Sequence, residues 1–150
     1  MSEPVKARAI GVNHVALEVD DIDAALEFYG ALLHFELRSR SDTAAFIDLG
    51  DQFINFSLGR RQGPDDQRHL GLVVDDRAAV AAALERLGVA LLPGPFMDFL
   101  DPWGNRIEIV GYRGIQFTKA PHVLRGMGLD ALDKSDEAIA ELADKGMAPE

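Results

Sequence analysis

Two histidines occupy equivalent positions in a stretch of sequence that occurs twice. Residues 13–21 read Asn-His-Val-Ala-Leu-Glu-Val-Asp-Asp, and residues 68–76 read Arg-His-Leu-Gly-Leu-Val-Val-Asp-Asp. His14 and His69 are therefore related by an internal repeat. Imidazole nitrogens bind divalent transition metals, so this pair could hold such an ion if the two copies of the unit face a common cleft.

Glu108 is the candidate third ligand. It lies between Ile107 and Ile109 in a late alternating run, which places the carboxylate on the side of a strand opposite its apolar residues. Two imidazoles and one carboxylate leave open positions and suit Fe(II), the first expectation, or Mn(II), Zn(II), Ni(II) or Co(II). A divalent metal ion at His14, His69 and Glu108 would polarise a substrate bound through two neighbouring oxygens.

Each of these residues also has a structural interpretation. A single histidine on a strand is more often hydrogen-bonded than metal-bound, and Glu108 could be solvated or paired with Arg106. Matching positions in matching elements are not expected of unrelated surface residues, so the three together favour a shared metal site.

The remaining candidates fall into two groups. The expected substrate contacts are the amide at the first copy's counterpart of Glu108 and three strand aromatics: Asn55, Phe46, Phe53 and Phe99. Structural filling is the alternative for the amide, and core packing for the aromatics. The expected acid–base groups are Glu108, Tyr112 and His122, of which the last two lie outside the repeat.

The same order of elements follows each copy of the repeat. The first unit, about 10–58, is predicted to contain a strand, a helix and three strands at 11–19, 22–33, 35–40, 44–49 and 52–58. After a polar linker at 59–67, the second unit repeats this order at 68–74, 77–87, 90–92, 96–100 and 106–111. The sequence therefore predicts an α+β domain over 1–112, built from two βαβββ modules in tandem.

The C-terminal extension, 113–150, does not belong to the repeat. It is predicted to be irregular as far as residue 134 and then to form a helix near 135–146, with Ser135 as its N-cap. This extension could close over a cleft, or it could cover a partner subunit.

Composition limits the class of partner. The chain has 150 residues and no cysteine, which excludes disulfides. Its formal net charge of −10 disfavours binding to nucleic acid or acidic membranes. The first residues lack the layout of a signal peptide, and no apolar run approaches the roughly 18 residues that span a bilayer. We therefore expect a cytoplasmic protein whose partner is a small-molecule substrate, without nucleic acid or membrane.

With the paired histidines, the runs 28–35 (Phe-Tyr-Gly-Ala-Leu-Leu-His-Phe) and 101–108 (Asp-Pro-Trp-Gly-Asn-Arg-Ile-Glu) carry a resemblance to a known family. Over residues 10–111 the chain resembles the vicinal oxygen chelate superfamily of glyoxalases, bleomycin resistance proteins and extradiol dioxygenases. The resemblance implies that the two modules form a U-shaped, partly open barrel-like cleft with a metal at the three proposed ligands. It also implies a homodimer.

The resemblance is less specific for the reaction. It implies a metal-dependent dioxygenase or a glyoxalase-like lyase or isomerase that acts on a small oxygenated substrate. Asn55 replaces the fourth ligand of glyoxalase I-like enzymes, and Ala16 replaces a threonine of the fosfomycin-resistance transferases, whose potassium loop is not recognisable before Asp101. The alternatives are a non-catalytic binding protein of the bleomycin-resistance type, or an interaction protein that docks through its C-terminal helix.

Overall fold

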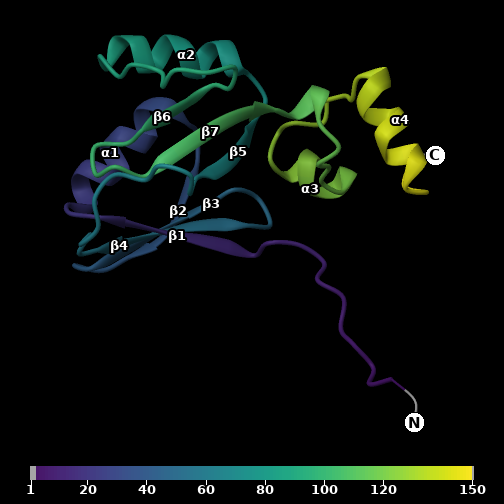
Figure 1. Cartoon of the computed structure of the whole chain (residues 1–150), viewed down its shortest axis with the longest axis horizontal. Helices are drawn as coiled ribbons and strands as arrows, with labels where there is room; N and C mark the ends of the chain where they lie inside the picture. Colours follow the sequence, from purple (N-terminus) through teal and green to yellow (C-terminus); the bar gives the residue numbers. More distant parts are fainter. Residues whose placement is uncertain (1–2, 150) are drawn as a thin grey trace.

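The structure, a computed structural model, describes residues 3–149 and contains two β-sheets (Figure 1). Strands β1, β4, β3 and β2 form the first sheet in that order, with bounds His14–Val19, Phe53–Leu58, Ala44–Asp48 and Glu36–Arg40. Strands β5, β7 and β6 form the second, with bounds Leu70–Val74, Arg106–Gly111 and Asp98–Leu100. Across residues 3–149, two mixed sheets with helices and no closed barrel confirm the predicted α+β class.

In the first module, alternating apolar and polar residues set the two faces of strand β1, and an N-cap residue sets the start of the helix that follows. Leu17 and Val19 of β1 are buried, whereas His14 lies on the other face of the strand and is exposed. Helix α1 (Ile22–Leu32) begins where Asp21 accepts a hydrogen bond from the amide of Ala24 at 2.9 Å, which satisfies one of the free N–H groups of the first turn. Strand β1 then pairs in parallel with β4.

The second module repeats these contacts. Leu72 and Val74 of β5 are buried, and β5 pairs in parallel with β7. Helix α2 (Arg77–Arg86) begins where Asp76 accepts a hydrogen bond from the amide of Ala79 at 3.0 Å. The aspartates that end each copy of the repeat therefore have the same capping role.

The second module has one strand fewer than predicted. Between α2 and β7, a segment that the structure describes throughout, residues 90–92 form no strand and the strand predicted at 96–100 is shortened to β6. The amide of Leu92 still donates to the carbonyl of Asp98 at 2.8 Å. Pro93 and Pro95 follow and have no N–H to continue a ladder, so the prediction of a strand at 90–92 is wrong and the module is βαββ.

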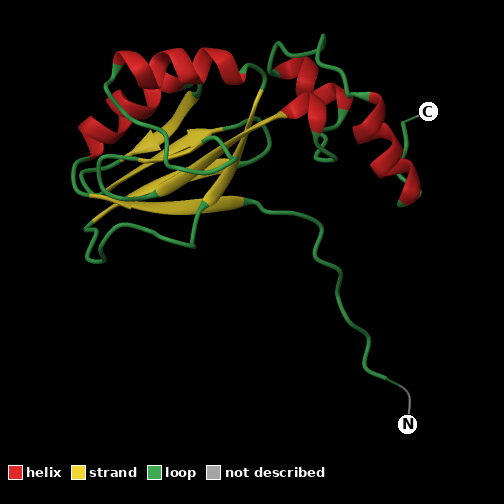
Figure 2. Ribbon diagram, turned by 45° about the horizontal axis from the view of Figure 1, so that its top comes forward, coloured by secondary structure: helices red, strands yellow, loops and turns green. Residues whose placement is uncertain are grey.

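One hydrophobic core joins the two modules. Its fully buried side chains come from α1, from the first sheet and from the second sheet, and the largest include Tyr29, Phe56, Phe99, Ile47 and Ile107. Figure 2 shows helices beside and above the strands, and α1 and α2 contact each other. The core therefore fixes how one module sits on the other within the chain.

The C-terminal extension is more ordered than predicted. After β7 the chain forms the 3₁₀ turn η1 (Tyr112–Gly114), the short helix α3 (Pro121–Gly126) and helix α4 (Asp136–Asp144). Ser135 caps α4 by accepting a hydrogen bond from the amide of Ala138 at 3.2 Å, which confirms the predicted last helix. The sequence did not predict α3, which has only six residues and an N-cap without a side-chain hydrogen bond.

Two further features concern the exterior of the molecule. The N-terminal arm, residues 3–11, runs away from the sheets (Figure 1), and Val5 and Ile10 on it are fully exposed. Among the described residues, no helix is both long enough and apolar enough to cross a bilayer.

Candidate metal and substrate site

The strand registers give each histidine an equivalent neighbour. His14 lies two residues before Ala16, whose partner across the β1–β4 pair is Asn55. In the same way, His69 lies two residues before Gly71, whose partner across the β5–β7 pair is Glu108. In the first module an amide therefore lies diagonally across the strand pair from the histidine, and in the second module a carboxylate has the equivalent position.

His14 lies on an aromatic surface with one ring nitrogen engaged. Its ring stacks on that of Phe53, with 4.7 Å between the centroids and 10° between the planes, and the Arg38 guanidinium lies 4.8 Å from the Phe53 centroid. The Nδ1 atom is 2.8 Å from Oδ1 of Asn13. A protonated Nδ1 donates to that oxygen and leaves Nε2 as the nitrogen that can bind a metal.

The tautomer of His69 is better defined. Its Nδ1 lies 2.9 Å from the backbone carbonyl oxygen of Gln67. Because a carbonyl can only accept, Nδ1 carries the proton and the neutral ring has its free lone pair on Nε2. The side chains of both histidines are exposed, so each ring offers an Nε2 lone pair that a divalent metal can bind.

One chain, however, does not bring the three predicted ligands together. His14 belongs to the lining of a cavity of about 780 Å³, which we call the larger cavity. Glu108 lines a separate, smaller cavity of about 400 Å³ with Arg77 and Phe96, and His69 lines neither. Within residues 3–149, no three His, Cys, Asp or Glu side chains are grouped closely enough to hold a metal ion. The donor chemistry fits a metal, but the geometry of the single chain does not.

Asn55 has an unsatisfied acceptor. Its Oδ1 atom is buried and finds no hydrogen-bond partner among the described residues. A buried acceptor without a donor costs about 1–3 kcal/mol, so such atoms commonly mark a place where a ligand, a water or another chain supplies the donor.

The predicted aromatic residues have different environments. Phe53 is half-buried and lines the larger cavity, and Phe46 lies 5.9 Å from it, centroid to centroid. Phe99 is fully enclosed in the core and lines neither cavity, so its place in the structure is one of packing.

The two residues expected as acid–base groups beyond the repeat both lie C-terminal to strand β7. Tyr112 is buried in η1, lines the larger cavity and has its hydroxyl 3.0 Å from that of Thr118. His122 is exposed on α3.

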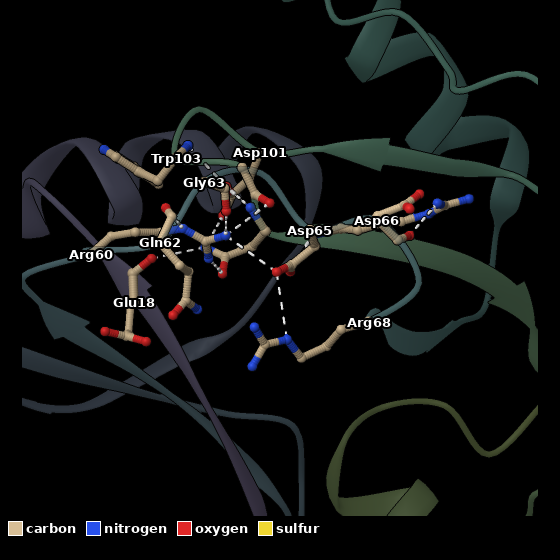
Figure 3. Close-up of polar contacts among 12 residues, drawn as sticks. Glu18, Arg60, Gln62, Gly63, Asp65, Asp66, Arg68, Asp101 and Trp103 are labelled. Atoms are coloured by element: carbon tan, nitrogen blue, oxygen red, sulfur yellow. Dashed lines mark hydrogen bonds and ion pairs between the residues drawn. The ribbon is translucent and has the colours of Figure 1, made fainter.

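A buried polar cluster that the sequence analysis did not identify connects the linker to the modules (Figure 3). The Arg60 side chain is only 3% exposed, forms an ion pair with Asp65 at 3.2 Å and donates to the carbonyl of Gly63 at 2.8 Å. It also donates to Oδ1 of Asn105, whose Nδ2 donates to the carbonyl of Glu18 at 2.9 Å. Arg60 had no sequence signal because it lies in a polar linker most of whose residues are exposed.

Asp101 is the anionic centre of this cluster. Its carboxylate accepts hydrogen bonds from the Tyr29 hydroxyl at 2.7 Å and from the amide of Asn105 at 2.9 Å. Burial, and then the charge of Asp101, raises the pKa of the Tyr29 hydroxyl well above its usual range, so that this group stays a neutral donor. Gly104 completes the turn with φ +90°, and a Cβ there would lie 2.8 Å from Cα of Pro64. The 101–105 turn therefore has a structural role.

Comparison with known families places the chain among its relatives. The family model of the Glyoxalase/Bleomycin resistance protein/Dioxygenase superfamily matches residues 11–109. The chain belongs to this superfamily. The match covers both sheets and ends before the C-terminal extension, so the resemblance inferred from the repeat is confirmed.

Two characterised members of the superfamily are similar over most of their length. Glutathione transferase FosA of Serratia marcescens is 28% identical over 110 residues, which are 65% of this chain and 78% of the transferase. Metallothiol transferase FosB of Staphylococcus epidermidis is 26% identical over 112 residues, which are 65% of this chain and 79% of that protein.

Solved structures of the superfamily share the fold. The fosfomycin resistance protein FosX of Listeria monocytogenes, complexed with Mn(II) and sulfate, has a TM-score of 0.61 at 16% identity and covers 80% of this chain and 99% of that one. The integron cassette protein VPC_CASS1, from the mobile metagenome of V. Pseudocholerae, has a TM-score of 0.57 at 26% identity and covers 73% of this chain and 100% of that one.

These relatives change the balance between the reactions expected from the sequence. One of these relatives is named a glutathione transferase and the other a metallothiol transferase, the branch that Ala16 and the unrecognised potassium loop made less expected. Dioxygenase and lyase or isomerase activity remain predictions.

Proposed function

We propose that this protein is a metal-dependent transferase that joins a thiol to a small oxygenated molecule, and that two copies of the chain complete its metal site. His14 of one copy would bind the divalent metal together with His69 and Glu108 of a second copy. The bound metal would supply Lewis-acid polarisation of a substrate oxygen. The homodimer expected from the resemblance is thereby given a specific purpose.

The observation that supports this proposal is the division of the ligands between separate environments. His14 and Glu108 line different cavities of one chain, yet their strands carry matched donor positions on equivalent sheets. The orphaned Oδ1 of Asn55 lies at the position in the first sheet that corresponds to Glu108. A second copy, or a substrate held by it, could supply the missing donor.

The reaction requires no redox partner. In the transfer, a sulfur–carbon bond forms while a carbon–oxygen bond of the substrate breaks, and the proton of the thiol ends on the freed oxygen. Phe53 and Asn55 are proposed to contact the substrate: Phe53 as an apolar surface beside His14, and Asn55 as an acceptor for a substrate hydroxyl.

Mixed dimers test the shared site directly. His14→Ala and Glu108→Ala chains carrying different tags are coexpressed, and the heterodimer is purified over both tags. If two copies complete the site, one intact and one doubly disabled site form, so the heterodimer binds about half of the wild-type metal while each homodimeric variant binds almost none. Metal in the heterodimer at the level of the single variants would overturn the shared arrangement.

Metal analysis of the wild-type protein and of His69→Ala tests the reaction class. Stoichiometric Fe(II) after anaerobic purification would favour the dioxygenase prediction, whereas other divalent metals, together with consumption of a thiol, would support transfer. Asp66→Ala provides a matched control, since this neighbouring acidic residue is exposed and is not a proposed ligand.

One observation favours a second candidate, a binding protein without turnover. The single chain does not assemble the ligand set, yet it contains a sizeable cavity. A binding protein predicts that His14→Ala leaves both metal content and small-molecule affinity unchanged, and a joint loss of both would exclude it.

A further inference from the structure

The larger cavity is of the size and character of a small-molecule site. Its volume of about 780 Å³ falls within the ~300–1,000 Å³ typical of ligand pockets. Apolar side chains from α1, β5, α2 and the C-terminal extension line it, among them Leu33, Leu72, Val80, Leu124, Met127 and Leu132. The same lining includes His14, which is a proposed metal ligand.

The wall formed by the C-terminal extension lies outside the segment that matches the superfamily. That match ends at residue 109, whereas the lining includes residues between Tyr112 and Leu132. This part of the cavity is therefore a feature of the extension that this chain adds to the common fold.

The extension is held in place by specific contacts. The Lys134 ammonium donates to the carbonyls of Tyr112 at 2.6 Å and Ile115 at 2.8 Å, and also to that of Phe117. It lies 3.5 Å from the centroid of the Tyr112 ring. Because one partly buried cation donates to three carbonyls of the loop, this wall has a defined shape.

A second set of contacts attaches the extension to the β3–β4 turn. Lys119 forms an ion pair with Asp51 and donates to Oε1 of Gln52 at 3.4 Å. Gly50, with φ +77°, lies so close to the extension that a Cβ there would be 2.5 Å from the sulfur of Met127. The extension is thus packed against the first module beside the strand end that carries His14.

We propose that the larger cavity binds the apolar body of an amphiphilic substrate, an aliphatic or aromatic molecule whose oxygen-bearing head reaches the metal at His14. The body follows from the leucine, valine and methionine lining. The assignment of the oxygen-bearing head depends on the function proposed above, because that head would bind the metal. The substrate class therefore differs from a small, wholly polar molecule, and the extension confers that preference.

Ligand binding can be measured without turnover. Straight-chain carboxylic acids of increasing length displace the fluorescent apolar probe 1-anilinonaphthalene-8-sulfonate from the full-length protein. We expect affinity to rise about two- to fourfold with each added methylene until the cavity is filled. Affinity that does not depend on chain length would overturn the proposal.

Two pairs of variants locate the binding site. Met127→Gln, in the lining, should weaken binding of the longer acids at least fivefold, whereas Met147→Gln, on the exposed end of the extension, should not. Ala79→Phe should fill the cavity and shorten the longest acid that binds, whereas Ala82→Phe, exposed on the same helix outside the lining, should not. Equal effects within either pair would contradict the assignment.

Two further measurements separate this proposal from its alternatives. The four variants should retain wild-type metal content, while His14→Ala should lose metal and still bind the apolar probe, so the two proposals fail independently. If Ile10→Asp instead raised probe affinity, the N-terminal arm would be the occupant of the cavity, and the ligand proposal would be overturned.

Discussion

At the scale of single residues, the buried Tyr29–Asp101 hydrogen bond links helix α1 to the turn before β7. Tyr29 is 1% exposed and Asp101 is 4% exposed, so the tyrosine hydroxyl depends on Asp101 for its hydrogen bond, and Asp101 depends on Tyr29 and Asn105 for donors. A buried carboxylate that loses a donor incurs an unsatisfied charge. This contact therefore matters more to stability than the exposed ion pair between Arg40 and Asp23.

Tyr29→Phe is expected to lower the free energy of unfolding by about 1–3 kcal/mol, measured by chemical denaturation. Because the folded pKa of Tyr29 is raised, its contribution is complete below the ordinary tyrosine pKa of about 10 and is lost as pH rises beyond it. The wild-type protein should consequently lose more stability above about pH 10 than the variant.

Tyr112→Phe is the matched control for this experiment, since its hydroxyl contacts only the neutral hydroxyl of Thr118 among the described residues. It should cost less than Tyr29→Phe. Equal losses in the two variants would show that the charge of Asp101 is unimportant.

At the scale of elements, the C-terminal extension is attached to the β3–β4 turn through the Asp51–Lys119 pair. A hydrogen bond from Lys119 is the main cause that holds the pKa of Asp51 below its ordinary value. Because the pKa of Asp51 is lowered in the folded protein, the contribution of the ion pair to stability falls as the pH falls. The pair stabilises the attachment above the ordinary aspartate pKa of about 4, and its contribution is lost as pH falls below that value through the folded pKa.

Asp51→Asn should therefore increase hydrogen exchange over residues 115–130 at neutral pH, because opening of the extension becomes easier. Comparing both proteins at the same pH cancels the chemical exchange rate. The difference should be constant above about pH 4 and shrink as the pH falls below that value, because the wild-type carboxylate then becomes protonated. A difference that does not shrink at all as the pH falls below about 4 would exclude the ion pair as its source, and Asp48→Asn is a control on the neighbouring strand.

At the scale of the whole molecule, the proposed site between two chains would link metal binding to association of the chains. A metal ion that binds only the dimer would stabilise the dimer, and dissociation of the dimer would in return weaken metal binding. This linkage has no counterpart in a site completed within one chain.

Removing the metal with a chelator should accordingly shift the protein from dimer toward monomer on dilution, and adding a divalent metal should reverse the shift. Sedimentation velocity across a range of protein concentrations measures both effects. His14→Ala should dissociate similarly with and without metal. Monomers that keep a full complement of metal would contradict a site between chains.

The face of each strand and the start of each helix were predictable because they depend on neighbouring residues. Strand alternation placed Leu17, Leu72 and Ile109 in the core, and the aspartates at the end of each repeat capped α1 and α2. The conformation of residues 90–92, in contrast, depended on the residues that follow them. A short apolar run became a loop because the prolines after it could not extend a ladder.

The sequence by itself determined the repeat, the α+β class, the donors that could bind a metal and the superfamily to which they belong. Only the tertiary structure decided that His14 and Glu108 line different cavities of one chain, that Arg60 lies within a buried cluster, and that residues 112–132 wall a cavity. The physical reason is the distance along the sequence over which the deciding interactions act. Strand phase and helix capping are set within a few residues, whereas the placement of one module on another depends on many weak contacts between distant residues.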